Sequence, residues 1–215
     1  LLFCQRNPKP CPLLEVIEAG SSEPVQTAPG ADLRTDVASY RVYRHGVLES
    51  EEENISGYWR DDMVSFLLGC SFTFDAALTR AGISMRHVEQ GTNVAMFITN
   101  VRTTPAGAFS GPLVVSMRPI PREKVVRAVQ VTSRFPAVHG APVHIGDPVA
   151  IGIGDLSAPD LGDPAEVREG EVPVFWACGV TPQAVAMSST PPLMITHSPG
   201  HMFITDLRDE DLSVL

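Results

Sequence analysis

Residues 133–148 concentrate ionisable side chains among prolines and glycines. The ionisable groups are Arg134, His139, His144 and Asp147. Proline removes a backbone donor and glycine weakens helices, so this segment is predicted to be a kinked loop. Imidazole titrates near neutral pH and suits a general acid or base, whereas an arginine can hold a carboxylate through two hydrogen bonds. The loop therefore predicts acid–base catalysis by His139, His144 and Asp147, with Arg134 binding the substrate.

Two cysteines occupy equivalent places elsewhere in the chain. Cys70 follows an apolar run and precedes Ser71, a candidate helix cap, while Cys178 follows another apolar run and precedes Thr181 and Pro182. At the start of a helix, backbone N–H groups attract anions and lower the pKa of a thiol. We therefore predict that Cys70 and Cys178 are catalytic and that Ser71 and Thr181 contact the substrate. The alternative for each cysteine is a small apolar residue that packs well at a strand end.

Two further segments carry candidate groups. His197 opens a His-Ser-Pro-Gly-His sequence that ends at His201, and Arg118 follows the apolar run 113–117. The histidine spacing matches no established metal motif, because proline and glycine break the helix that would place both rings on one face. No metal is therefore predicted, and His197 is expected to act in hydrogen bonding or acid–base chemistry. Arg118 is a candidate anchor for a substrate carboxylate, with a surface salt bridge as the alternative.

The motifs of the common cofactors are absent from the sequence. No Gly-x-Gly-x-x-Gly follows a predicted strand, and there is neither a Walker-type phosphate loop nor a Gly-x-Ser-x-Gly nucleophile elbow. Nicotinamide, flavin and ATP are therefore disfavoured, and no cofactor is predicted.

Composition narrows the class of protein. The chain has a net charge of −9, with 44% hydrophobic and 19% charged residues, as is usual for globular proteins. A negative net charge disfavours nucleic acids and anionic membrane surfaces as partners, and no apolar run reaches the roughly 18 residues that span a bilayer. None of the four cysteines forms a Cys-x-x-Cys pair, so we expect reduced thiols in a cytoplasmic or organelle-matrix protein.

Hydrophobic periodicity and turn residues predict an α/β fold. The predicted strands are 63–69, 94–99, 113–117, 149–153, 172–177, 193–196 and 202–205, with a hairpin at 40–49. The predicted helices are 72–81, 121–132 and one that begins at Thr181. We interpret residues 92–150 as a smaller two-layer α+β domain inserted into an α/β sandwich domain, which comprises residues 1–91 and 151–215.

Several stretches along the chain resemble a known family. They are 7–12, 32–36 with 40–43, 69–72, 115–119, 133–148, 170–183 and 195–202. Together they resemble the hydro-lyase family that includes D-glutamate cyclase. The resemblance implies a two-domain α/β enzyme, a carbon–oxygen lyase that converts D-glutamate into 5-oxo-D-proline with loss of water. It also implies a further stretch before Leu1, and it transfers no catalytic residue to a position of this sequence.

Two other functions stay open. Paired cysteines at strand ends resemble the layout of the two-base racemases that act on aspartate and glutamate, which favours an amino-acid racemase or isomerase built on Cys70 and Cys178. The second alternative is a non-catalytic protein that binds small carboxylic acids. The expected partner is in each case a small carboxylic or amino acid. Homo-oligomers are common among such proteins, although no sequence feature specifies one.

Overall fold

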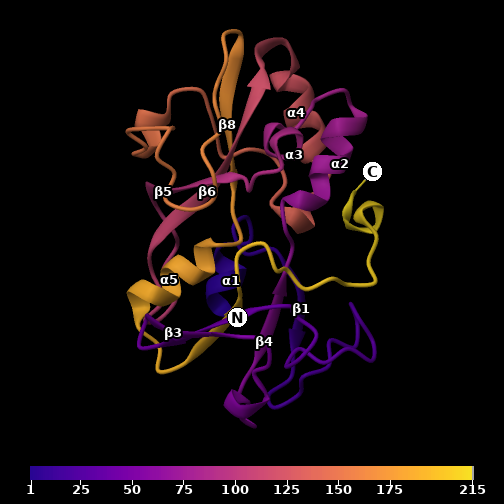
Figure 1. The fold of residues 1–215 in the computed structure, drawn as a ribbon, viewed down its shortest axis with the longest axis vertical. Coiled ribbons are helices and arrows are strands. Elements are labelled where there is room, and N and C mark those ends of the chain that lie inside the picture. The colour runs from indigo at the N-terminus through magenta and orange to yellow at the C-terminus, as the bar shows by residue number, and fades with distance from the viewer. Residues whose placement is uncertain (215) are drawn as a thin grey trace.

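The computed structural model describes residues 1–214, in which short helices and strands follow one another (Figure 1). The strands are β1 (Leu13–Ile17), β2 (Tyr40–Arg44), β3 (Val47–Glu52), β4 (Ser65–Leu68), β5 (Ala95–Arg102), β6 (Pro112–Pro121), β7 (His144–Ile145), β8 (Glu171–Ala177) and β9 (Met194–His197). The α-helices are α1 (Leu2–Arg6), α2 (Phe72–Arg80), α3 (Arg86–Gln90), α4 (Val125–Thr132) and α5 (Thr181–Ser189). Short 3-10 helices are η1 (Ser56–Tyr58), η2 (Arg122–Lys124), η3 (Pro136–Val138), η4 (Pro148–Ile151) and η5 (Asp209–Leu212). This mixture of helices and strands confirms the predicted α/β class.

The described strands pair in an antiparallel manner throughout. They form a four-stranded sheet in the order β5-β6-β8-β7, a three-stranded sheet in the order β3-β2-β9, and a two-stranded sheet of β1 and β4. In Figure 1 the four-stranded sheet occupies the upper part of the molecule, with α2, α3 and α4 beside it. Strand β8 comes from outside the predicted inserted domain and yet pairs with β6 and β7. The division into two domains stays a prediction.

The four-stranded sheet has a buried core on each face. On one face Val174, Trp176 and Ile120 pack with residues of α2 and α4. On the other face Phe175 and Met117 pack with residues from β5 and the segment after β7. Successive side chains of a strand point to opposite faces, which explains why neighbours in β8 belong to different cores. Burial of each large side chain contributes about 2–3 kcal/mol to folding.

A close backbone contact joins the end of β4 to η3. A Cβ atom at Gly69 would lie 1.9 Å from the carbonyl oxygen of Ala137, so only glycine fits at this point. His139 follows η3 directly and has a positive φ of 82°. Because Cys70 follows Gly69, this contact brings the first strand–cysteine–helix unit against the histidine loop.

Two predicted strands are wrong. Residues 149–153 form η4 and its C-terminal turn instead, because Pro148 starts a helical turn that the Asp147 side chain caps by accepting a hydrogen bond from the Val149 N–H at 3.0 Å. Gly152 ends this turn with a φ of 84°. Residues 202–205 have no strand pairing in the described structure. The strands at 63–69, 94–99, 113–117, 172–177 and 193–196, and the hairpin at 40–49, are confirmed within a few residues.

None of the helices within residues 1–214 is long and apolar enough to cross a membrane.

Candidate functional site

Polar side chains gather on the face of the four-stranded sheet that α2 covers. Ser116 and Arg118 lie two residues apart in β6, and Ser116 is paired with Trp176 of β8. All three are almost completely inaccessible to solvent. Cys178 follows β8 immediately, and its backbone N–H donates to the Val114 carbonyl at 3.0 Å. The alternation of β6 therefore directs a hydroxyl and a guanidinium into the interior beneath α2.

Arg118 is the centre of a buried hydrogen-bond network. Its Nε and Nη2 atoms donate to the two carboxylate oxygens of Asp75 at 2.9 and 3.1 Å. Nη1 donates to the Ser116 hydroxyl at 3.0 Å, and Nη2 also donates to the Ser71 hydroxyl at 3.1 Å. Ser71 therefore binds the arginine instead of capping α2. A buried cation needs such partners, since an uncompensated charge in the interior is strongly destabilising.

Aromatic rings and a histidine complete the surroundings of this ion pair. The guanidinium carbon of Arg118 lies 5.1 Å from the ring centre of Phe74 and 5.5 Å from that of Trp176, at cation–π distance. Nε2 of the buried His87 lies 3.1 Å from the second oxygen of Asp75. The indole N–H of Trp176 has no hydrogen-bond partner in residues 1–214. A buried donor without a partner is rare, and here it lies beside the network.

The two predicted cysteines lie at the starts of α2 and α5. Backbone N–H groups of Phe72 and Ser71 lower the pKa of Cys70, and those of Val180 and Gly179 do the same for Cys178. Burial is nevertheless the larger effect for both thiols, raising the pKa of Cys70 and bringing that of Cys178 to about 11. The prediction that the helix starts lower these pKa values overall is therefore wrong, because desolvation outweighs the helix N–H groups.

The two thiols lie in one electrostatic environment. A negative charge on Cys70 would raise the pKa of Cys178, whereas the positive charge of Arg118 lowers the pKa of both. Cys178 Sγ is also 3.6 Å from the sulfur of Met96. Cys70 is partly exposed and Cys178 is buried, and Cys70 directly precedes Ser71, which binds Arg118.

His139 lies between the two cysteine turns. A Cβ atom placed on the exposed Gly179 would be 3.9 Å from the Nε2 and Cε1 atoms of the ring and from the Gly69 carbonyl oxygen. Nδ1 is 2.8 Å from the Lys9 carbonyl oxygen, which makes Nδ1 the protonated nitrogen of the neutral ring. Burial lowers the pKa of His139 to about 4, against the opposing effect of the Lys9 and Gly69 carbonyls. The imidazole is therefore neutral at physiological pH, and Nε2 faces the cysteine turns.

Lys9 adds a cation to the same place. Its ammonium nitrogen would be 3.8 Å from a Cβ atom on Gly140, the residue after His139. Partial burial lowers the pKa of Lys9, and the lysine charge in turn lowers the pKa of His139. The arrangement thus holds a neutral imidazole beside an ammonium group, two thiols and two helix N-termini. Such a set can bind a carboxylate, move protons and stabilise an oxyanion.

Comparison with known proteins places this arrangement in a family. A family model described as D-glutamate cyclase matches residues 64–206, which include both cysteines, Arg118 and His139. This chain belongs to the D-glutamate cyclase family. The sequence resemblance noted above is thereby confirmed.

Relatives of this D-glutamate cyclase family member match 99–100% of its length. A protein of Stutzerimonas stutzeri (strain A1501) named "Putative hydro-lyase" is 67% identical over 215 residues, 100% of this chain and 81% of that protein. One of Thermoanaerobacter sp. (strain X514) is 68% identical over 213 residues, 99% of this chain and 80% of its own length. YcsI of Bacillus subtilis (strain 168) is 64% identical over 215 residues, 100% of this chain and 84% of its own length. The last two also carry the hydro-lyase name.

Two predicted catalytic residues of this cyclase-family chain, His144 and Asp147, lie in and just after β7. His144 is directly opposite Phe175, and the two rings are 5.7 Å apart. Its Nε2 lies 2.6 Å from the carbonyl oxygen of Asp147, whose own side chain caps η4. Residues directly opposite in an antiparallel pair point to the same face, so His144 follows Phe175 away from the face that carries Arg118. The structure does not bring His144 and Asp147 to the buried network.

Three other predicted residues have their own contacts. The hydroxyl of Thr181 donates to the Cys178 carbonyl at 2.8 Å and accepts from the Val114 N–H at 3.1 Å, so it fastens α5 to β6. His197 is exposed, with Nδ1 2.7 Å from the carbonyl oxygen of Ser198. Arg134 is exposed and lies in a groove between α2 and α4. Of these three, only Thr181 is adjacent to the cysteine turns.

Sequence reasoning missed Asp75, His87 and Ser116 of the buried network, and it missed Lys9 beside His139. Lys9 stands in the Asn-Pro-Lys-Pro-Cys-Pro stretch that carries part of the resemblance, and Ser116 stands two residues before Arg118. The positions of Lys9 and Ser116 in the sequence could therefore have indicated a role in the site. Asp75 and His87 offered none, because they are joined to Arg118 only by tertiary contacts. In residues 1–214 no group of three histidine, cysteine or acidic side chains is placed to hold a metal ion.

Proposed function

We propose that this protein is a carbon–oxygen lyase that converts D-glutamate into 5-oxo-D-proline and water. Membership of the D-glutamate cyclase family and the hydro-lyase names of its relatives support the reaction class. The single observation that carries the proposal is the neutral, buried His139 beside the starts of α2 and α5. Cyclisation of an amino acid needs a base, an oxyanion site and a cation for the remaining carboxylate, and this cluster supplies all three.

The reaction balances without a co-reactant. The α-amino nitrogen forms a bond to the γ-carboxyl carbon, and one γ-carboxyl oxygen leaves. Two of the three ammonium protons leave with that oxygen as water, and the third stays on the lactam nitrogen. The net charge is −1 on both sides, so the protein has only to move protons and to stabilise the tetrahedral intermediate.

The surroundings of each residue in the cluster determine the role that we assign to it. Nε2 of His139 is the base that takes the two protons from the substrate nitrogen one after the other and gives each of them to the leaving oxygen. Backbone N–H groups at the starts of α2 and α5 stabilise the oxyanion. Lys9 binds the α-carboxylate, and the protonated thiols of Cys70 and Cys178 line the reacting centre. Arg118 positions Ser71 and α2 rather than binding substrate, because Asp75, Ser71 and Ser116 already occupy its guanidinium.

The proposal is tested by product analysis. Purified protein is incubated with D-glutamate and, separately, with L-glutamate, and 5-oxoproline is quantified on a chiral column. We expect formation of one enantiomer well above the spontaneous rate. Equal, spontaneous rates from both enantiomers with folded protein would contradict the cyclase function.

The proximity of the two thiols favours one second candidate, a two-cysteine isomerase. One thiolate would remove the Cα proton and the other thiol would return a proton to the opposite face. Incubation in deuterium oxide separates the two reactions, because cyclisation leaves the Cα hydrogen in place. Deuterium at Cα that disappears in both Cys70→Ser and Cys178→Ser, but persists in Cys4→Ser, would establish the isomerase and replace the cyclase.

A further inference from the structure

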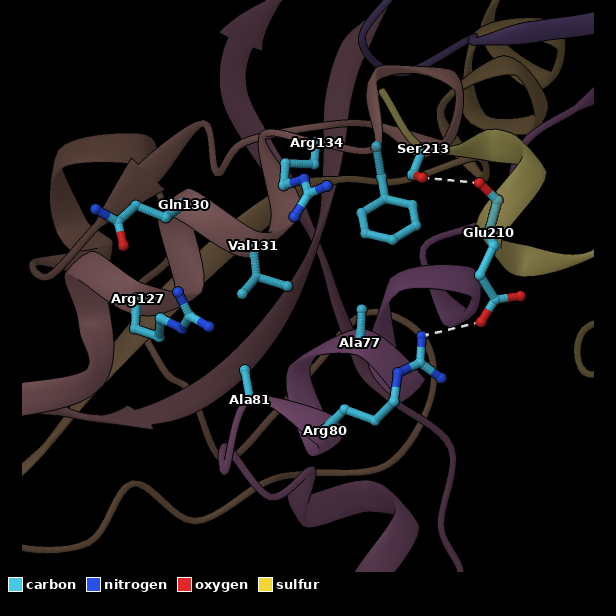
Figure 2. A pocket seen from close by; sticks show the side chains of 10 residues that line it. Ala77, Arg80, Ala81, Arg127, Gln130, Val131, Arg134, Glu210 and Ser213 are labelled. Atoms are coloured by element: carbon cyan, nitrogen blue, oxygen red, sulfur yellow. Dashed lines mark hydrogen bonds and ion pairs between the residues drawn. The ribbon is translucent and has the colours of Figure 1, made fainter. Parts of the chain in front are cut away.

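A groove of about 510 Å³ lies between α2 and α4, away from the cysteine turns (Figure 2). Val131 and Phe135, both buried, form part of its floor. Its rim carries three arginines: Arg80 from α2, Arg127 from α4, and Arg134, which follows α4. The groove is therefore apolar at its base and cationic at its edges.

The cationic character is unusual for this molecule, whose net charge is −9. In Figure 2 the side chains of Arg127 and Arg134 extend on either side of Val131. Among residues 1–214, Arg127 forms no ion pair or hydrogen bond, and the guanidinium of Arg134 forms one hydrogen bond, from Nε to the Val214 carbonyl at 3.3 Å. Most N–H donors of these two guanidinium groups are thus left unbonded by the described part of the chain.

Among the described residues that line the groove, Glu210 carries the carboxylate, and it is weakly held. Glu210, from the C-terminal segment, lies 3.3 Å from Arg80, and both side chains are about 60% exposed, at 64% and 59%. Exposed ion pairs of this kind contribute little to stability. A ligand with more negative charge can therefore displace Glu210 from Arg80 at a small cost in free energy. Arg80 would then bind the ligand together with Arg127 and Arg134.

We propose that this groove is a binding site for a small organic anion with at least two carboxylate or phosphate groups. Arginine binds both groups through paired hydrogen bonds, and arginines on both sides of the groove match charges at the two ends of a short molecule. The carbon atoms between those charges would lie against Val131. This site is separate from the proposed cyclase centre, and its occupancy does not depend on the cyclase reaction.

The binding test uses isothermal titration calorimetry on the whole chain at low salt, without glutamate. Citrate serves as the carboxylate probe, pyrophosphate as the phosphate probe, and acetate as the single-charge control. We expect saturable one-to-one binding of citrate or pyrophosphate that weakens with salt, and no measurable binding of acetate. The tighter of the two probes identifies the preferred anionic group. Absence of saturable binding for both probes would overturn the proposal.

Variants distinguish binding in this groove from general electrostatic attraction of anions to the protein surface. Arg127→Gln combined with Arg134→Gln is expected to weaken the affinity about tenfold or more. Arg122→Gln removes an exposed arginine outside the groove and should leave the affinity unchanged. Glu210→Gln removes the internal competitor and should strengthen binding severalfold, whereas Glu169→Gln, elsewhere on the surface, should not. An equal effect of the groove variants and their controls would contradict a specific site.

Discussion

At the scale of single residues, burial decides which protonation state each group of the cluster carries. His139 is neutral where a free histidine would titrate, because burial lowers its pKa to about 4. The thiols of Cys70 and Cys178 keep their protons, because burial raises their pKa values. The cluster therefore offers a proton acceptor next to proton donors at neutral pH, which is the arrangement that cyclisation requires.

The lowered pKa of His139 predicts a pH dependence of stability. Above pH 6.5 the imidazole is neutral in both the folded and the unfolded chain, and its contribution to stability is complete. As the pH falls from about 6.5 to about 4, only the unfolded chain takes up the proton, so up to about 3 kcal/mol of stability is lost. His139→Asn, which tolerates the positive φ, should lose less stability over this interval.

Urea unfolding at pH 7 and pH 4.5 measures this difference. His144→Asn is the matched control, because that ring lies outside the cluster. This variant should lose as much stability between pH 7 and pH 4.5 as the original protein does. Identical pH dependence in the original protein and in His139→Asn would show that the histidine is not buried as described.

The buried ion pair between Arg118 and Asp75 predicts a large loss of stability when the carboxylate charge is removed. Asp75→Asn removes the charge that compensates a guanidinium which is only 1% exposed, and breaking such a pair costs about 3–5 kcal/mol. Asp62→Asn breaks the exposed pair with Arg60 and should change stability by less than about 1 kcal/mol. Thermal unfolding of both variants provides the comparison, and similar, small changes would contradict a buried network.

At the scale of elements, the sequence predicted local structure better than the way elements pair. The two strand–cysteine–helix units and the hairpin were evident because apolar runs, turn glycines and helix caps are local signals. The placement of His144 was not evident, since its face depends on which residue of β8 lies opposite. Residues 149–153 were misinterpreted because the cap from Asp147 and the Pro148 helical start override strand-like composition. Asp75 and His87 join the site only through tertiary contacts, which no sequence spacing reveals.

The contact between β4 and η3 predicts an effect of one methyl group. Gly69→Ala would place Cβ 1.9 Å from the Ala137 carbonyl oxygen, so the loop that carries His139 must move. We expect a loss of about 1–3 kcal/mol in stability and a strong loss of cyclase activity. Gly57→Ala meets no atom within 4 Å and should preserve both. Unfolding curves and turnover of the two variants measure the effect, and wild-type behaviour of Gly69→Ala would refute the contact.

At the scale of the whole molecule, helix α2 links two regions of different chemistry. Its start lies at Cys70 and Ser71 in the buried cluster, and its last turn lines the arginine groove. The sequence alone grouped His139 and Arg134 in one loop. The structure places His139 in the buried cluster and Arg134 in the arginine groove. The net charge of the chain is −9, so attraction for anions depends on local groups of cationic side chains such as these.

The central claim is that the cluster around His139 performs the chemistry. The most direct measurement compares kcat/KM for D-glutamate cyclisation in the original protein, His139→Asn and His144→Asn, with folding of each variant verified at pH 7. We predict that His139→Asn lowers kcat/KM by about 10²-fold or more, the usual contribution of a general base, while His144→Asn stays within a few-fold of the original. Full activity of a folded His139→Asn variant, or a greater loss in His144→Asn, would contradict the account.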